Sequence, residues 1–95
     1  MKEFYVYIIC SKRTGTLYIG VTSNLIKRIY EHKNGLAEGF SKTYEVHRLV
    51  WYERHETAES AIVREKQIKK WNREWKLRLV DEFNPRWDDL YESLL

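Results

Sequence analysis

The sequence predicts an α+β domain in which a three-stranded, mainly antiparallel sheet is flanked by helices in the order β-β-α-β-α-α. Three runs of β-branched and aromatic residues, at 4–10, 16–22 and 46–53, are typical of strands. Helical patterns separate and follow them. With 95 residues, 43% of them hydrophobic, the chain has room for one core. We therefore treat residues 1–95 as a single domain.

The first half of the chain predicts a hairpin followed by a helix. Residues 4–10 form a strand that we expect to be covered on both faces, because they contain almost no polar side chain. Residues 11–15 have the composition of a hairpin loop, and 16–22 form the second strand. A capping Asn and apolar residues at helical spacing predict a helix over 24–33. A mobile loop is expected at 36–43.

The second half of the chain predicts one strand and two helices. Residues 46–53 form the third strand. A helix follows over 58–71, and a further helix over 74–82 ends before Pro85. Residues 87–95 are expected to form a short amphipathic helix or an ordered tail.

The charge is unevenly distributed along the chain. The net charge is +3, yet five acidic residues between 81 and 95 face the single Arg86, which gives this segment −4 and leaves +7 for residues 1–80. A basic body with an acidic end is typical of a surface that binds a polyanion. The acidic element at 81–95 is expected to pack on the domain or to be partly mobile.

The cysteine content and the apolar runs predict a cytoplasmic protein. Cys10 is the single cysteine, so it has no partner for an internal disulfide, and we interpret it as a strand residue in a reducing compartment. No run approaches the roughly 20 apolar residues that span a bilayer. The apolar stretch near the N-terminus is too short and too aromatic for a signal peptide. No membrane partner is expected.

One acidic residue, Glu65, falls on the apolar side of the predicted helix over 58–71. At 100° per residue it lies among Ala61, Ile62 and Ile68. Burying an ionised carboxylate without a partner costs on the order of several kcal/mol. A basic residue or a metal ion would offset this cost, or this side of the helix opens to solvent. The residues alone leave these alternatives open.

Four further residues could join Glu65 in one site. Arg28 and His32 are four residues apart and share one helix face. Tyr7 and Tyr18 lie on neighbouring strands, where their phenols could meet on one face of the hairpin. Each of these residues taken alone has an ordinary packing or surface explanation. Together, a phenol, a guanidinium and a metal-binding carboxylate fit attack on a phosphodiester.

With these residues in place, the sequence resembles the GIY-YIG endonuclease superfamily. The likeness is to its small stand-alone bacterial members, which are similar to the N-terminal nuclease domain of the excinuclease of nucleotide excision repair. The first motif matches at 5–9, with Tyr5 in place of the namesake glycine, and the second matches in full at 18–20. The helix pattern with Arg28 and His32 follows. The segments at 61–71 and 84–90 resemble the helix with the metal-binding glutamate and the ending of the stand-alone members.

The resemblance implies roles for the residues at the matching positions. Tyr7 would act as general base or position the attacking water, and Tyr18 would assist it and hold the phosphate. Arg28 would stabilise the transition state, and His32 would transfer a proton or contact phosphate. Glu65 would be the single protein ligand of one Mg²⁺ or Mn²⁺ ion, with water and phosphate oxygens completing the shell. Gly20 and Asn84, with Asn72 as an alternative, are candidate supporting residues.

The resemblance also implies DNA as the partner, in a structured, branched or damaged form, and a role in DNA repair or recombination. A basic stretch on the later helices is the candidate DNA-binding surface. Trp71 and Trp75 within it could stack on bases, but we expect them to pack mainly within the protein. The alternative is a nucleic-acid-binding or adaptor module that keeps the fold and cleaves little or not at all. The basic residues are Lys66, Lys69, Lys70, Arg73, Lys76 and Arg78.

Overall fold

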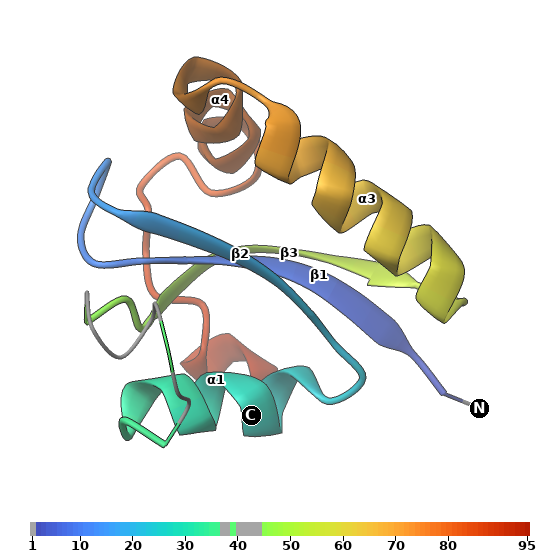
Figure 1. Cartoon of the computed structure of the whole chain (residues 1–95). Helices are drawn as coiled ribbons and strands as arrows, with labels where there is room; N and C mark the ends of the chain where they lie inside the picture. The colour runs from blue at the N-terminus through green and yellow to red at the C-terminus, as the bar shows by residue number, and fades with distance from the viewer. Residues whose placement is uncertain (1, 37–38, 40–44) are drawn as a thin grey trace.

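The computed structural model describes residues 2–36, 39 and 45–95 (Figure 1). The predicted α+β class and the predicted order of elements are confirmed. The loop expected at 36–43 lies almost wholly outside the described residues. The elements are β1 (Phe4–Cys10), β2 (Leu17–Thr22), α1 (Leu25–Lys33), β3 (Arg48–His55), α3 (Ala58–Lys70), α4 (Arg73–Phe83) and the short 3-10 helix η1 (Glu92–Leu94).

The sheet has the strand order β2-β1-β3, and both pairings are antiparallel. β1 is the central strand, and Tyr7 on it lies opposite Gly20 of β2 and Tyr52 of β3. β3 begins at Arg48 and continues to His55, so the prediction of a strand over 46–53 was wrong by two residues. The pairing of β1 from its first residue, Phe4 with His55, extends β3 past the apolar run.

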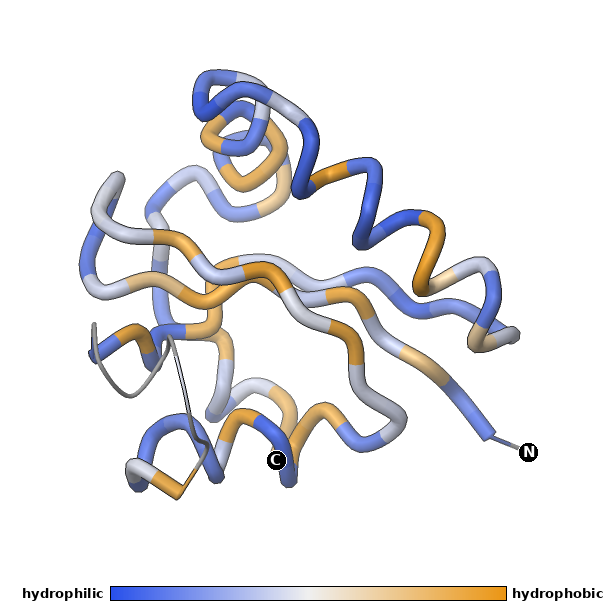
Figure 2. The backbone as a smooth tube through the Cα atoms, viewed as in Figure 1, coloured by the Kyte–Doolittle hydropathy of each residue, from blue (hydrophilic) through white to orange (hydrophobic). Residues whose placement is uncertain are grey.

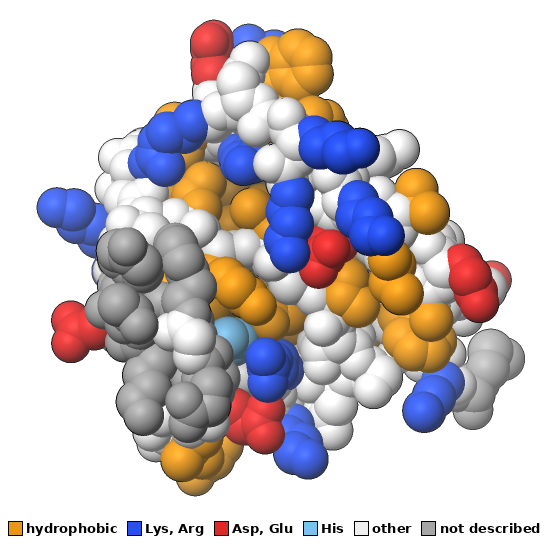
Figure 3. Space-filling view, in the orientation of Figure 1, with side chains coloured by type: hydrophobic (Ala, Val, Ile, Leu, Met, Phe, Trp, Pro, Cys, Tyr) orange, Lys and Arg blue, Asp and Glu red, His pale blue; other side chains and the backbone are white. Residues whose placement is uncertain are grey.

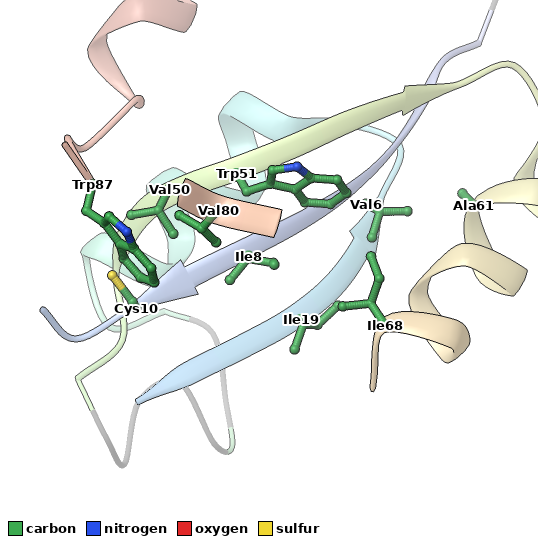
Figure 4. Packing of buried hydrophobic residues seen from close by; sticks show 10 residues of the cluster. All are labelled: Val6, Ile8, Cys10, Ile19, Val50, Trp51, Ala61, Ile68, Val80 and Trp87. Carbon is green, nitrogen blue, oxygen red and sulfur yellow. The ribbon is translucent and has the colours of Figure 1, made fainter. Parts of the chain in front are cut away.

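The residues of β1 alternate between two hydrophobic layers, as expected for a strand covered on both faces. Val6, Ile8 and Cys10 point to one face, where α3 and α4 cover them (Figures 1 and 4). Hydrophobic residues recur along all three strands and interrupt the mostly hydrophilic helices α3 and α4 (Figure 2). The buried residues of this first layer are Val6, Ile8, Cys10, Ile19, Val50, Trp51, Ala61, Ile68, Val80 and Trp87.

The opposite face of the sheet is covered by α1 and by the C-terminal segment (Figure 1). Tyr7 and Ile9 of β1 point into this second layer, where they meet Leu25 and Ile29 of α1. The layer thus receives a tyrosine from the middle of the central strand. Its buried members are Tyr7, Ile9, Leu25, Ile29, Val46 and Leu49.

The helices α1, α3 and α4 each begin at a side chain that accepts a hydrogen bond from the first turn. Asn24, Thr57 and Asn72 accept from the backbone N–H of the residue three positions later. Trp71 has extended backbone angles and separates α3 from α4. None of the helices in the described part of the chain is long and apolar enough to cross a bilayer.

The C-terminal segment crosses from one layer to the other. Trp87 is fully buried in the first layer, and its backbone N–H donates to the Asn84 carbonyl at 2.9 Å. Leu90 then donates to the Leu49 carbonyl at 2.8 Å, beside the second layer. The expected helix over 87–95 is limited to η1, because Trp87 has a φ of 55°, which a helix does not accommodate. The alternative of an ordered tail describes the segment better.

Asn84 holds this crossing in place, so its loss should destabilise the protein. Its buried amide donates to the carbonyls of Val50 and Asp88 at 3.2 and 2.9 Å, and its Oδ1 accepts from the Asp88 N–H. Asn84→Ala leaves these groups unpaired, and we expect the free energy of unfolding to fall by about 1–3 kcal/mol in urea titrations. The exposed Arg86→Ala is the control, expected within about 0.5 kcal/mol of wild type. Equal losses in both variants would contradict this role.

Candidate active site at the β2 edge of the sheet

The two motif tyrosines meet on the face of the sheet that α1 covers. Tyr7 pairs with Gly20 and Tyr18 pairs with Ile9, so the two side chains lie diagonally across the β1–β2 hairpin. Their ring centroids are 6.3 Å apart. The expectation that the two phenols share one face of the hairpin therefore holds in the structure.

Gly20 makes the space in which the Tyr7 ring lies. A Cβ atom at Gly20 would sit 2.5 Å from Tyr7 Oη and 2.6 Å from Tyr7 Cζ, closer than van der Waals contact permits. The second motif therefore requires glycine because any side chain would displace the phenol. The Tyr7 side chain fills this space with only 1% of the residue exposed.

His32 of α1 completes a cluster of three rings. Its ring centroid lies 5.8 Å from that of Tyr7 and 5.6 Å from that of Tyr18, and its Nε2 is 3.0 Å from Tyr7 Oη. The residue is only 6% exposed. Burial, with the nearby positive charge of Arg28, lowers the pKa of His32 to about 4. The imidazole is therefore neutral near pH 7.

Burial has the opposite effect on the phenol. It raises the pKa of Tyr7 to about 12, and hydrogen bonding with the Arg28 guanidinium lowers that pKa without outweighing burial. Arg28 also contacts Glu31, with Nη1 3.3 Å from Oε1. Because its side chain is partly exposed, Arg28 joins the buried Tyr7 hydroxyl to the surface of the molecule.

A surface hollow of about 340 Å³ lies beside Arg28, where β2 passes into α1. On this side of the molecule, Figure 3 shows a histidine ring and basic side chains around exposed hydrophobic groups. A site for a negatively charged ligand next to Arg28 is compatible with this surface. The lining residues are Val21, Thr22, Ser23, Asn24, Lys27, Arg28 and Glu31.

Glu65 approaches the cluster from α3, which covers the other face of the sheet. Ala61 and Ile68 are fully buried, Ile62 is exposed, and the Glu65 side chain between them retains 19% exposure. Its Oε2 is 3.4 Å from Lys69 Nζ. Its charge contributes to raising the pKa of Tyr7, which places it within electrostatic reach of the phenol. Of the three residues that the helical spacing placed around Glu65, Ala61 and Ile68 are in the core as predicted, whereas the prediction for Ile62 was wrong, because its side chain faces solvent.

The surroundings of Glu65 fit a Mg²⁺ or Mn²⁺ ion better than zinc. Magnesium is commonly held by one or two carboxylates, with waters and substrate phosphates as the other ligands. A half-buried carboxylate that keeps an exposed edge provides such a ligand. In the part of the chain that the structure describes, no three His, Cys, Asp or Glu side chains gather as a closed metal cage would require.

The two candidate asparagines have structural roles. Asn84 contacts β3, at the sheet edge opposite β2, and Asn72 caps α4 by accepting from the Trp75 N–H. The structure therefore does not bring either side chain to the tyrosine cluster, and Gly20 is the supporting residue that it does bring there.

Some side chains of the predicted basic surface are exposed to solvent, and others contact the rest of the protein. Lys66, Lys69 and Lys70 are exposed on α3, and Lys76 on α4 is partly buried. The Arg73 guanidinium donates to the backbone carbonyls of Thr14 and Gly15, the second at 2.6 Å. Arg73 is therefore used to hold the β1–β2 hairpin against α4.

Sequence reasoning missed two residues at the mouth of the site. Lys27 lines the hollow beside Arg28, and Glu31 pairs with Arg28. The signal for Glu31 was present, because Arg28 and Glu31 are three residues apart on one helix face. No sequence pattern indicated Lys27, since its position in the hollow depends on how the turn before α1 folds.

The low pKa of His32 predicts a loss of stability in acid. Between pH 6.5 and 4 the unfolded chain binds a proton at His32 that the folded protein does not, so the stabilisation is full above about pH 6.5 and falls as the pH approaches 4. At pH 4.5 we expect a loss of about 2 kcal/mol from this group in urea titrations. In His32→Gln the pH dependence should be shallower. Identical slopes in wild type and His32→Gln would refute the assignment.

Comparisons with known proteins agree with this arrangement. Residues 3–78 match the GIY-YIG catalytic domain family. The chain is 37% identical over 82 residues to a UPF0213 protein of Staphylococcus saprophyticus and 36% identical over 83 residues to one of Staphylococcus aureus, covering 86% of this chain and 99% of each relative. The solution NMR structure of a UPF0213 protein from Bacillus halodurans has a TM-score of 0.58 and 26% identity, with 95% of each chain covered. Since the family match spans both tyrosine motifs, Arg28, His32 and Glu65, the chain belongs to the GIY-YIG catalytic domain family.

Proposed function

We propose that this protein is a divalent-metal-dependent endonuclease that hydrolyses phosphodiester bonds of DNA. The observation that carries the proposal is the buried Tyr7–His32 hydrogen bond, with Arg28 on its solvent side and Glu65 within electrostatic reach. A neutral proton acceptor, a phenol and a cation at one partly open site supply the groups that attack on phosphorus needs. Membership of the GIY-YIG family supports the same reaction.

The raised pKa of Tyr7 requires a second group to receive its proton. With a pKa of about 12 the phenol is protonated near pH 7, so it cannot by itself remove a proton from water. His32 is neutral, and its Nε2 lies 3.0 Å from Tyr7 Oη. In the proposed step Tyr7 takes a proton from the attacking water as its own proton passes to Nε2. Tyr18, whose ring packs against both, orients the water and the phosphate.

Arg28 and Glu65 would stabilise the negative charge that develops on the phosphate during the reaction. The Arg28 guanidinium faces the hollow at the start of α1, where it would bind the phosphate oxygens as negative charge builds on them. Glu65 would hold the Mg²⁺ or Mn²⁺ ion, which as a Lewis acid would neutralise charge on the phosphate and the leaving oxygen. Lys69, now paired with Glu65, would then be released to contact the DNA backbone.

We further propose that the substrate is branched or damaged DNA and that the protein acts in repair or recombination. The exposed lysines of α3 support binding to the phosphate backbone. We place the protein in the cytoplasm, because Cys10 is the single cysteine and is free, as is typical of a reducing compartment.

Substitutions at Glu65 and Arg28 should abolish most of the cleavage. With plasmid and branched DNA in Mg²⁺ or Mn²⁺, we expect Glu65→Gln and Arg28→Lys to lower the rate of nicking by roughly 10²–10³-fold. The first removes the charge of the metal-binding carboxylate, and the second replaces the planar fork of guanidinium donors with a single ammonium group. Glu59→Gln, which removes an exposed carboxylate from the same helix, is the matched control and should cut like wild type.

Two outcomes of this experiment would overturn the nuclease assignment. Equal residual cleavage by wild type and both site variants would identify a contaminating activity. Salt-dependent DNA binding without cleavage in either metal would instead support the alternative, a nucleic-acid-binding or adaptor module that keeps the fold.

Gly20→Ala should impair the site through Tyr7 alone. The added Cβ would meet the phenol at 2.5 Å, so we expect unfolding to become easier by about 1–3 kcal/mol and the nicking rate to fall at least tenfold. In a double-mutant cycle the stability cost should largely vanish when Gly20→Ala is made in a Tyr7→Ala background. A cost that persists in that background would show that the clash lies elsewhere.

A further inference from the structure

An aromatic groove lies at the junction of α3 and α4, on a surface that the proposed chemistry does not use. It encloses about 180 Å³ and is lined by Trp71, Trp75, Arg78, Leu79 and Glu82. Trp75 is 51% exposed, contrary to the expectation that both tryptophans pack mainly within the protein. Two aromatic side chains therefore line one solvent-facing groove, where a flat ligand can stack on them.

The groove is held in a fixed shape by contacts on its protein side. The Trp71 and Trp75 rings meet edge to face, with centroids 5.9 Å apart and an interplanar angle of 77°. The Arg64 guanidinium lies 5.4 Å from the Trp71 ring centroid. Arg73, between the two tryptophans in sequence, is tied to the β1–β2 loop by its two hydrogen bonds. A rigid aromatic surface of this kind loses little entropy when a flat ligand stacks on it.

The groove itself is lined by one basic and one acidic residue, Arg78 and Glu82, whereas the helices beside it are basic. Residues 64–78 carry seven Lys and Arg against Glu65 and Glu74, which favours an anionic occupant. In Figure 3 basic side chains lie over α3 and α4 beside exposed hydrophobic groups. A second copy that met this groove with its own groove would bring the same positive charge against it and be repelled. Nucleic acid matches both features, because its phosphates are negative and every base has a flat face for stacking.

The groove lies close to Glu65 along the chain. Trp71 follows Glu65 by six residues, which corresponds to a rise of about 9 Å along the axis of α3 and a rotation of about 240° around it. The groove and Glu65 therefore lie within two turns of the helix but on different sides of it, and a strand bound at Glu65 would reach the groove by passing around α3.

We propose that the Trp71–Trp75 groove stacks an unpaired base of the DNA substrate, close to the phosphate that is cut. A base inside a duplex is covered on both faces by its neighbours, so the base that reaches Trp75 must be unpaired, as in a single strand, a flap, a bulge or a frayed end. The substrate class is thus DNA with an unpaired nucleotide beside the cut. The position relative to the cut rests on the proposed function, whereas stacking in the groove does not.

The test compares two oligonucleotides that carry equal charge. Fluorescence anisotropy would measure binding of the intact protein, with a chelator present to prevent cleavage, to single-stranded oligothymidylate and to an abasic oligonucleotide of the same length. We expect wild type to bind the base-containing strand on the order of tenfold more tightly. Trp75→Ala should remove this preference and leave abasic binding unchanged, and Trp75→Phe should keep most of it. Phe83→Ala, which removes another exposed aromatic ring of α4, should retain the full preference.

Three results would overturn the proposal. The first is equal affinity of wild type for the two strands, and the second is an equal loss on both strands in Trp75→Ala. The third is self-association in sedimentation velocity that Trp75→Ala abolishes, which would assign the groove to a second copy. Failure of the nuclease proposal looks different, because plasmid would stay uncut in Mg²⁺ and Mn²⁺ while the preference for bases persisted.

Discussion

The rest of the structure depends on the burial of β1 on both faces. Because side chains alternate along a strand, Val6 and Ile8 enter the layer under α3 and α4, whereas Tyr7 and Ile9 enter the layer under α1. A shift of one residue in the pairing would exchange the two sets and place Tyr7 against the wrong helix. The packing of two hydrophobic layers therefore fixes the register on which the tyrosine cluster is built.

The same burial determines the charge state of the cluster. Removal from water disfavours the phenolate of Tyr7 and the imidazolium of His32, so both groups are neutral near pH 7 and share one hydrogen bond. Among the described residues no buried side-chain polar atom lacks a hydrogen-bond partner. The charges that the proposed chemistry needs are carried instead by Arg28 and Glu65, whose side chains are partly exposed. Contact with solvent reduces the free energy that is lost when a charged group is removed from water.

The sequence predicted the element order and the meeting of Tyr7 with Tyr18, since both follow from strand alternation across one hairpin. It also placed Glu65 on the apolar side of its helix, but it left open whether a basic residue, a metal ion or contact with solvent offsets the charge. The pairing with Lys69 and the partial exposure depend on how the helix packs on the sheet, which residue spacing does not show. The sequence did not predict that Trp87 is buried in a left-handed conformation or that Trp75 is exposed. Both depend on contacts between segments far apart in the chain, which local patterns do not record.

The crossing of the C-terminal segment has a consequence for how the protein folds. Trp87 completes the layer under α4, and Leu90, Tyr91 and Leu94 pack against the other layer, so both cores are incomplete without residues 87–94. β1 also pairs with β3 across 38 to 51 residues of chain, from Cys10 with Arg48 to Phe4 with His55. Contacts between segments this far apart in the chain slow folding. Loss of residues 84–95 would leave both layers exposed, and such a chain would be a substrate for chaperones.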